Sequence, residues 1–319
     1  MKLHDGAVLW LIAWVDRVLG FLQQADTAFT RYSSPYALRA RVVPFVHSFQ
    51  GVDAEPFKVF ITSVADFNRI HRRKPDPLLV VPALVKSGYW TAPVYWDIGA
   101  NTGLSFVQLS RMIERIDGSS AAFECEPTTY LSLQRNIALN RLGRAKCYPL
   151  AISHTEDTAR FFVNVNKIRV KEDLLAFVAS GTGRHSFALD EKRHDERAGY
   201  EIVRLSPTFL VEQLGLMAPN WVYIDAYGSE SEIVRGFGPL LEREPRPGVF
   251  ILEIDSNLAD EHDPRSSPAA GALLDAGYEL YPIRSTPGLH HCYFIDKRIP
   301  SETVAFIQQD VASRKHLLK

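Results

Sequence analysis

The chain has 319 residues, enough for one large domain and an extension, and its formal net charge is −1. A charge so close to neutral gives no electrostatic footprint for nucleic acid, so we expect no nucleic-acid partner. Hydrophobic residues make up 46% and charged residues 23%, and the three cysteines indicate neither a disulfide framework nor a zinc site. We therefore expect a soluble, cytoplasmic protein without a bound metal.

The first part of the chain is predicted to be a helical extension, residues 1–77, ahead of a second domain, residues 78–319. Near its start, the apolar run GAVLWLIAWV is too short to span a bilayer. Trp10 and Trp14 lie one helical turn apart, so residues 6–22 would either make a peripheral contact with a membrane or pack as a helix on the main domain. We expect packing, and nothing in the sequence indicates an oligomeric state.

From residue 78 onward, predicted strands and helices alternate. This alternation is typical of an α/β fold with a mostly parallel sheet and helices on both of its faces. The last strand is expected to pair with its predecessor as an antiparallel edge. In chain order the predictions are a strand and helix in 94–116, a strand in 120–127, a helix in 128–143, strands in 145–153 and 159–165, a strand and helix from 220, a strand in 248–255, a helix and strand in 269–283, and a strand in 292–298.

The first of these strands ends in an acid and a glycine-rich turn, VYWDIGANTG, residues 94–103. Asp97 lies among β-forming apolar residues, and an acid there is costly unless something pairs with it. Gly99 and Gly103 bracket a turn in which the backbone must bend sharply or let something approach closely. The stretch therefore predicts a strand, a turn and a helix, and it raises the question of what the turn holds.

Acids also lie at the ends of later strands, at Glu124 and Asp225, and Glu253 lies near the end of the strand predicted in 248–255. The carboxyl ends of parallel strands meet at one edge of a sheet, where α/β folds bind ligands, and carboxylates gathered there repel unless a cationic or hydroxyl-rich ligand lies among them. A dinucleotide would need a GxGxxG turn, and Asp97 would repel its phosphates. S-adenosyl-L-methionine carries an ammonium, a sulfonium and a ribose diol, for which Glu124 is well placed, so we expect this cofactor.

Four segments, DIGANTG, FECEPTTYLSLQRNIALN, YIDAYGSESEIVRG and FILEI, resemble in this order the motifs of the FkbM family of S-adenosyl-L-methionine-dependent methyltransferases. The resemblance covers roughly residues 78–298. It implies the class I methyltransferase fold, a Rossmann-like, seven-stranded and mostly parallel sheet with helices on both faces and an antiparallel last strand. It also implies methyl transfer, commonly to a hydroxyl of a saccharide, a glycoconjugate or a natural product.

The resemblance also implies roles for individual residues. Glu124 would hold the ribose hydroxyls, Cys125 would pack beside the adenine, and Ala151 would lie near the adenine edge. Asp225 would lie under the transferred methyl group. Five residues would line the methionine part of the cofactor: Asp97, Gly99, Ala100, Asn101 and Gly103.

The sequence departs from the family after the strand that precedes Asp225. The family usually has Lys-Ile-Asp-Val-Glu-Gly, whereas this chain has Tyr223, then Asp225, then Tyr227 in place of the second carboxylate. Any mechanism that needs paired carboxylates there is weakened, although Asp225 alone can accept a proton from an acceptor hydroxyl. Tyr227 would either position the acceptor or simply pack. His185 is the first alternative to Asp225 as the base, because imidazole titrates near neutral pH.

Two functions remain open at this point. One is an O-methyltransferase, and the other is a cofactor-binding or partner-binding protein on the same fold, whose turnover the Tyr227 substitution has weakened. Two polar segments, residues 180–199 and 256–268, are predicted to form either a lid over the acceptor or ordinary surface loops. Their mixture of arginine, histidine, serine and aspartate suits a hydroxyl-rich or anionic acceptor.

Overall fold

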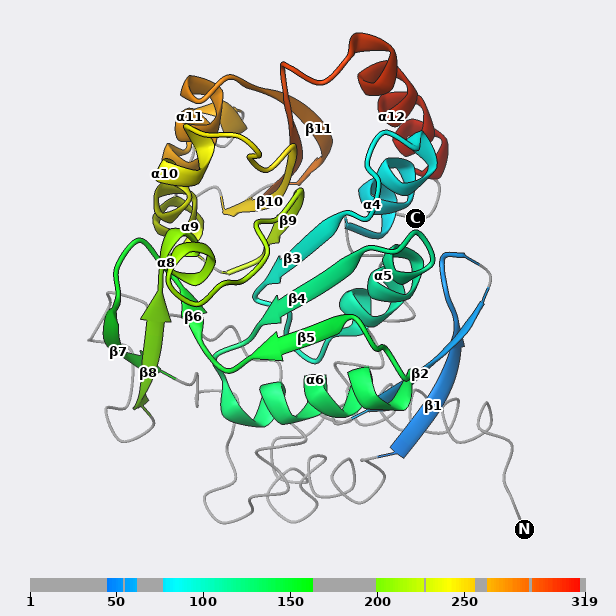
Figure 1. The fold of residues 1–319 in the computed structure, drawn as a ribbon, viewed down its shortest axis with the longest axis vertical. Helices are drawn as coiled ribbons and strands as arrows, with labels where there is room; N and C mark the ends of the chain where they lie inside the picture. Colours follow the sequence, from blue (N-terminus) through cyan, green and yellow to red (C-terminus); the bar gives the residue numbers. More distant parts are fainter. Residues whose placement is uncertain are drawn as a thin grey trace, which may run out of the picture.

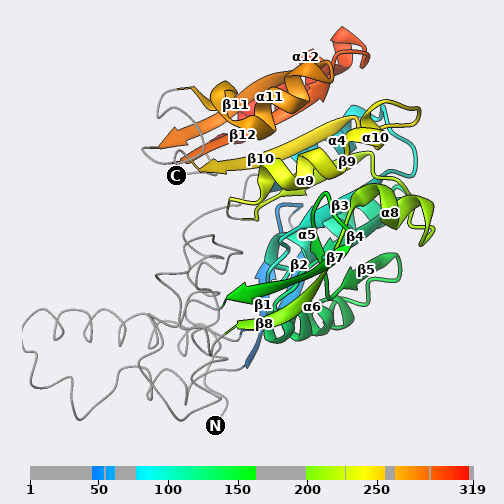
Figure 2. The same ribbon diagram turned by 90° about the vertical axis from the view of Figure 1, so that its left-hand side faces the viewer.

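The centre of the computed structural model is a seven-stranded sheet, ordered β11-β12-β10-β9-β3-β4-β5 (Figures 1 and 2). The structure describes residues 45–53, 55–61, 77–162, 199–226, 228–255, 263–286 and 289–315. β5, β4, β3, β9 and β10 run parallel to one another, whereas β12 is antiparallel to both of its neighbours, β10 and β11. The strands are β3 Val94–Ile98, β4 Ser119–Phe123, β5 Ala145–Tyr148, β9 Trp221–Ile224, β10 Val249–Asp255, β11 Tyr278–Thr286 and β12 Leu289–Asp296.

This arrangement confirms the predicted fold class, a mostly parallel seven-stranded sheet with an antiparallel last strand. One detail was wrong, because β12 is an inner strand and β11 forms the edge. The central strands are apolar on both faces, since alternate residues face two separate cores. In β3, Tyr95 belongs to one core and Trp96 to the other.

Helices cover the two faces of the sheet (Figure 1). The helices α4 Pro77–Ser87, α5 Leu104–Glu114, α6 Pro127–Leu139 and α12 Ser301–Arg314 contribute to the core that contains Tyr95. The other core receives α8 Pro207–Glu212, α9 Glu230–Gly236, α10 Gly238–Leu241 and α11 Pro268–Asp275. Among the described residues, none of the helices has the length and apolar character that crossing a bilayer requires.

A second, three-stranded sheet lies beside the first and has the order β6-β8-β7. It contains β6 Ala151–Ile152, β7 Asp157–Phe162 and β8 Gly199–Leu205. The single strand predicted over 145–153 is therefore two strands in different sheets. Pro149 separates them, because proline lacks the N–H that a continuing ladder needs. The strand predicted near 159–165 corresponds to β7, outside the main sheet.

The extension before residue 77 contains an antiparallel hairpin of β1 Phe45–Gln50 and β2 Pro56–Ile61. The prediction of a wholly helical extension is therefore wrong for these residues. In β2, Phe57 and Val59 are buried while Lys58 between them is exposed, which is the alternation of a half-buried strand. Residues 6–22, for which we predicted either membrane contact or packing, lie outside the described part of the chain.

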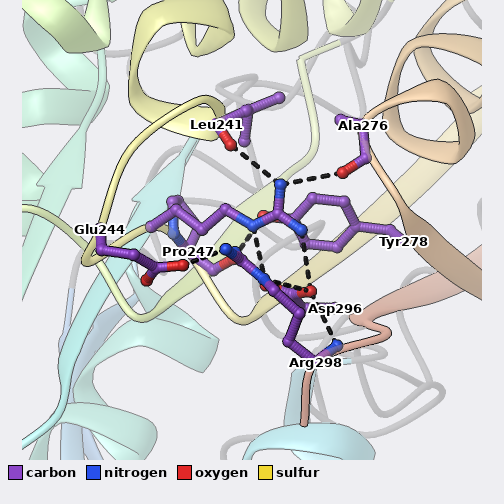
Figure 3. Close-up of polar contacts among 8 residues, drawn as sticks. Leu241, Glu244, Pro247, Ala276, Tyr278, Asp296 and Arg298 are labelled. Atoms are coloured by element: carbon purple, nitrogen blue, oxygen red, sulfur yellow. Dashed lines mark hydrogen bonds and ion pairs between the residues drawn. The ribbon is translucent and has the colours of Figure 1, made fainter.

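A network of paired charges lies at the amino end of β10 (Figure 3). Arg246 donates from Nε and Nη2 to the two carboxylate oxygens of Asp296, both at 2.8 Å, and its guanidinium carbon lies 4.8 Å from the ring centre of Tyr278. Arg298 also pairs with Asp296, and it contacts Glu244 as well. We call Arg246, Asp296 and Arg298 the paired cluster.

Candidate functional site

The glycine turn after β3 is held between two neighbouring strands. Gly99 and Gly103 have φ angles of 83° and 79°, which favour glycine, and Asn101 between them has a φ of 53°. A Cβ atom placed on Gly99 would lie only 2.1 Å from the carbonyl oxygen of Asp225. Both readings of the turn are therefore correct, since the backbone bends sharply and is also closely approached, in this case by the end of β9.

Asp97 lies beneath this turn and is completely buried, with 0% of its surface exposed. Its Oδ2 accepts a hydrogen bond from the Tyr95 hydroxyl at 3.2 Å, whereas its Oδ1 is buried with no hydrogen-bond partner. Burial raises the pKa of Asp97 to about 8, and the carboxylates of Asp225 and Glu124 contribute to the rise, while the Tyr95 hydrogen bond opposes it. A buried acid in this condition is costly, and a cationic donor would relieve the cost.

Glu124, directly after β4, is fixed by two backbone amides. Its Oε2 accepts from the N–H of Asn101 at 2.9 Å, and its Oε1 accepts from the N–H of Glu126 at 2.8 Å. Burial raises the pKa of Glu124 to about 7, although these two hydrogen bonds lower it. Each oxygen keeps a second lone pair, so the carboxylate can accept further hydrogen bonds without moving.

Cys125, in the loop after β4, and Ala151, in β6, meet in one small apolar cluster with Phe161 and Ile202. Burial raises the pKa of the Cys125 thiol, with the Glu124 carboxylate adding to the rise, so the thiol stays neutral. The two residues that the resemblance placed beside an adenine therefore share a neutral, apolar surface next to Glu124.

Asp225 follows β9 and lies beside the glycine turn. Its backbone N–H donates to the carbonyl of Ile98 at 3.0 Å, and its Oδ2 accepts from the Tyr223 hydroxyl at 3.2 Å. The tyrosine that replaces the family's lysine at 223 thus hydrogen-bonds the acid two residues later. Tyr227 and His185, the other predicted catalytic residues, lie outside the described part of the chain.

Glu230, at the first position of α9, is a buried acid that the sequence reasoning missed. Its Oε1 accepts from the N–H of Gly228 at 3.1 Å, and its Oε2 is buried with no hydrogen-bond partner. Burial raises its pKa to about 7, with the Asp225 carboxylate contributing to the rise. An acid in the first turn of a helix is common because it complements the helix dipole, so the sequence alone gave no reason to single it out.

We call Asp97, Glu124, Asp225 and Glu230 the acid cluster. The Asp225 carboxylate raises the pKa of each of the other three, so the four acids act on one another electrostatically. In the described structure, no lysine, arginine or histidine pairs with Asp97, Glu124 or Glu230. Nor do any three described His, Cys, Asp or Glu side chains form a group that could hold a metal ion. The cluster suits a ligand with cationic groups and hydroxyl donors.

A line of polar side chains continues from Asp225 across the sheet. Ile224 is in register with Leu252, so Asp225 and Glu253 follow at the same level of β9 and β10. Glu253 is in register with His291 of β12, which is in register with Arg284 of β11. His291 Nδ1 lies 3.4 Å from Glu253 Oε2 and 3.4 Å from an Arg284 nitrogen. We call Asp225, Glu253, His291 and Arg284 the polar row.

The acceptor side is described only in part. β12 begins at Leu289, before the strand predicted over 292–298, so His290 and His291 lie within it and are buried. A third histidine, His154, contacts Glu232. Most of the two predicted lid segments lies outside the described residues. Arg265, from the second segment, is in a short 3-10 helix, Pro264–Ser266.

Solved structures and a family model were compared with this chain. Solved structures similar to this chain include an FkbM methyltransferase from Methylobacillus flagellatus KT (15% identity, 71% of this chain and 49% of that chain, TM-score 0.40). They also include a precorrin-6y C5,15-methyltransferase from Geobacter metallireducens GS-15 (14%, 67% and 86%, TM-score 0.37). A third is Aeropyrum pernix fibrillarin in complex with natively bound S-adenosyl-L-methionine (11%, 78% and 94%, TM-score 0.39).

No protein of curated function matches the sequence. The family model described as the methyltransferase FkbM domain matches residues 97–280, which is more than half of the chain. The match begins at Asp97 and extends through Glu124, Asp225 and Glu230 into β11. The chain therefore belongs to the FkbM family of methyltransferases, whose cofactor is S-adenosyl-L-methionine.

Proposed function

We propose that this methyltransferase methylates a hydroxyl oxygen of a saccharide, a glycoconjugate or a natural product. The polar row carries the proposal, because Asp225, Glu253 and Arg284 are partly exposed and can hydrogen-bond a hydroxyl. His291 is completely buried between Glu253 and Arg284 and contacts both. An apolar acceptor would displace water from the exposed parts of Asp225, Glu253 and Arg284 without offering hydrogen bonds in return, which is costly.

The acid cluster and its neighbours fit the cofactor. Glu124 would accept the ribose hydroxyls with its remaining lone pairs, and Asp97, whose Oδ1 is buried without a partner, would accept from a cationic donor. Cys125 and Ala151 would pack against the adenine. The rest of the glycine turn, Gly99, Ala100, Asn101 and Gly103, would line the methionine part. When bound, S-adenosyl-L-methionine supplies an activated methyl group on a sulfonium.

Asp225 is the proposed base. It lies beside the glycine turn and begins the polar row, so an acceptor hydroxyl held by the row would face both Asp225 and the cofactor site. The acceptor oxygen would gain the methyl group that the bound cofactor supplies, with the cofactor's sulfur keeping the bonding electron pair, as the oxygen loses its proton. The hydroxyl proton passes to the Asp225 carboxylate and from there to solvent. Holding the hydroxyl in line supplies much of the rate. Roles for Tyr227 and His185 stay predictions.

Glu230 supports turnover over the alternative of a protein that only binds the cofactor. That alternative rested on the loss of a second carboxylate at Tyr227. Three residues later, Glu230 brings a buried carboxyl close enough to Asp225 to be affected by its charge. The strand end thus retains two acids despite the substitution.

Calorimetry tests the cofactor assignment. Glu124→Ala should bind S-adenosyl-L-methionine at least about tenfold more weakly than the wild type, because hydrogen bonds to a charged group contribute roughly 1.5–3 kcal/mol. Glu126→Gln is the matched control, since Glu126 is a neighbouring buried acid whose Oε2 caps α6 through Thr129. Its affinity should stay within about threefold of the wild type. Equal binding by wild type and Glu124→Ala would remove the ribose assignment.

Methyl transfer to a panel of acceptors tests the reaction. With methyl-labelled cofactor, the label should appear as a methyl ether on a saccharide or polyol. Asp225→Asn should lower kcat by about 10²- to 10⁴-fold, the usual contribution of a general base, while cofactor affinity changes little. Label found only on nitrogen or sulfur acceptors would refute hydroxyl methylation. An unchanged kcat in Asp225→Asn would assign the base elsewhere.

A further inference from the structure

One buried side chain connects the N-terminal hairpin to the cofactor turn. Asn136 of α6 is completely buried, with 0% of its surface exposed. Its Oδ1 accepts from the N–H of Phe60 in β2 at 2.6 Å, and its Nδ2 donates to the carbonyl of Thr102 in the glycine turn at 2.7 Å. These two contacts also fix the orientation of the amide, because Phe60 offers a donor and Thr102 an acceptor.

Asn140, one helical turn later, makes a similar contact with the hairpin but none described with the turn. Its Oδ1 accepts from the N–H of Lys58 at 2.8 Å, and its Nδ2 donates to the carbonyl of Lys58 at 2.6 Å. Four residues of helix rise about 6 Å and two residues of strand about 6.6 Å, so an amide in α6 and the amide of its C-capping residue match alternate residues of β2. The two side-chain amides therefore hydrogen-bond the backbone of β2 as a neighbouring strand would.

Other contacts hold the hairpin against α5 and α6. Arg111 donates to Asp53 at 2.8 Å and to the carbonyl of Pro56, and Arg115 also pairs with Asp53, at 3.0 Å. The guanidinium carbon of Arg135 lies 4.2 Å from the ring centre of Phe60. The hairpin thus packs on α5 and α6. Because Phe60 of the hairpin donates to Asn136, the position of the hairpin also fixes the Asn136 side chain.

The contact at the Thr102 carbonyl helps to hold the conformation of the glycine turn. It lies between Asn101 and Gly103, both in the left-handed backbone region, which persists only where the surroundings hold it in place. Asn101 in turn donates its N–H to Glu124, the proposed ribose ligand. Removal of the Asn136 contact would loosen the turn and with it the hydrogen bond that orients Glu124.

We propose that Asn136 is a positioning residue through which the docked hairpin orders the cofactor turn, so that hairpin docking and cofactor binding favour each other. Such coupling is reciprocal, so bound cofactor must also steady the hairpin. The proposal rests on the proposed function only in that the turn receives S-adenosyl-L-methionine.

The test combines calorimetry with amide hydrogen exchange on the full chain. Asn136→Asp keeps the acceptor for Phe60. Measured at a pH at which its buried carboxyl is ionised, it puts a carboxylate oxygen against the Thr102 carbonyl and so breaks the turn contact. It should bind S-adenosyl-L-methionine about tenfold more weakly, the effect of one buried hydrogen bond. Asn140→Ala is the matched control, which should speed exchange in residues 56–61 and weaken cofactor binding by less than about threefold.

The decisive measurement is whether bound cofactor slows amide exchange in β2. In the wild type and in Asn140→Ala, bound cofactor should slow exchange across residues 56–61, and in Asn136→Ala this effect should disappear. Cofactor-dependent slowing that survives in Asn136→Ala, or wild-type affinity in Asn136→Asp, would overturn the proposal. If Asn136→Ala fails to fold, Asn136→Asp carries the same test.

A wild type that binds no cofactor would instead refute the proposed function. The inference would then be decided by exchange in the ligand-free turn, residues 99–103. These amides should exchange faster in Asn136→Asp than in the wild type, and equal rates would overturn it.

Discussion

The paired cluster and the acid cluster lie at opposite ends of the same sheet and differ in how their charges are balanced. β10 begins beside the paired cluster and leads to Glu253, next to Asp225 of the acid cluster. In the paired cluster, Arg246 has Asp296 on one side and the carbonyls of Leu241 and Ala276, each at 2.8 Å, on the other (Figure 3). In the acid cluster, the described hydrogen-bond donors to the carboxylates are neutral hydroxyls and backbone amides, and neighbouring carboxylates raise one another's pKa values.

This difference separates a structural use of charge from a functional one. A buried ion pair with all its hydrogen bonds satisfied keeps its neighbours in place and has nothing left to offer a ligand. Buried acids with raised pKa values and an unpartnered oxygen are held at a cost to the fold, and they gain from a ligand that brings the missing positive charge. Removing the charge of Asp296 in the paired cluster should therefore lower the free energy of unfolding. Removing the charge of an acid in the acid cluster should raise it.

The largest effect is expected at the paired cluster. Asp296→Ala leaves the Arg246 guanidinium, whose side chain is only 10% exposed, without its counter-charge. We expect the free energy of unfolding to fall by about 3–5 kcal/mol, as it does when one member of a buried pair is removed. Urea unfolding measures this loss.

Arg298→Ala is the control, because the Arg298 side chain is 50% exposed and pairs with the same carboxylate. Its cost should be below about 1 kcal/mol. Equal losses of unfolding free energy in the two variants would show that burial of an ion pair does not determine how much it contributes to stability.

The second effect is a pH dependence of the ligand-free protein. Asp97, Glu124 and Glu230 have pKa values of about 8, 7 and 7 in the fold, above the ordinary 3.8 for Asp and 4.5 for Glu. The folded state thus binds more protons than the unfolded state between those values. This contribution to stability is fully present below pH 4, and it is lost as the pH rises towards 8, by up to about 1.4 kcal/mol per pH unit for each group.

Urea unfolding from pH 5 to pH 8 should therefore show a loss of stability to which Asp97 alone contributes up to about 4 kcal/mol. Asp97→Asn mimics the protonated acid, so its profile should be flatter and its stability at pH 8 higher than that of the wild type. Parallel profiles for the two proteins would mean that Asp97 is ionised in the fold at neutral pH.

The smallest effect is the release of protons on cofactor binding. At pH 7 the acid cluster is partly protonated, and a cationic ligand beside it lowers the pKa values of its acids. We expect release of up to about one proton per S-adenosyl-L-methionine bound, seen as a binding enthalpy that varies with the ionisation enthalpy of the buffer. The demethylated product lacks the sulfonium, so it should release fewer protons. Equal release with both ligands would place the cluster away from the sulfonium.

The sequence was sufficient for the features that local patterns determine. The strand, glycine turn and helix around Asp97 are encoded within a few residues, and the acids at strand ends follow from the parallel sheet. Local patterns also mark two features that the predictions did not include, the break in the strand over 145–153 and the strand β2. Pro149 marks the break between β5 and β6, and the alternation around Lys58 marks β2.

Other features depend on register and on distant contacts, so no local pattern could reveal them. The pairing of His291 with Glu253 requires the alignment of β10 with β12, and the Asn136 bridge joins residues from three elements. Glu230 resembles an ordinary helix-start acid until its burial is known.

The inner position of β12 also determines when the sheet can be completed during synthesis. β12 is the last of the described strands to be made, yet it lies between β10 and β11, and β11 has no other neighbour in the sheet among the described residues. Until the ribosome has delivered residues 289–296, the nascent chain exposes one unpaired edge of β10, whose sequence VFILEID is strongly apolar. Such an edge is a template for aggregation. Chains released before β12 should therefore be especially dependent on chaperones.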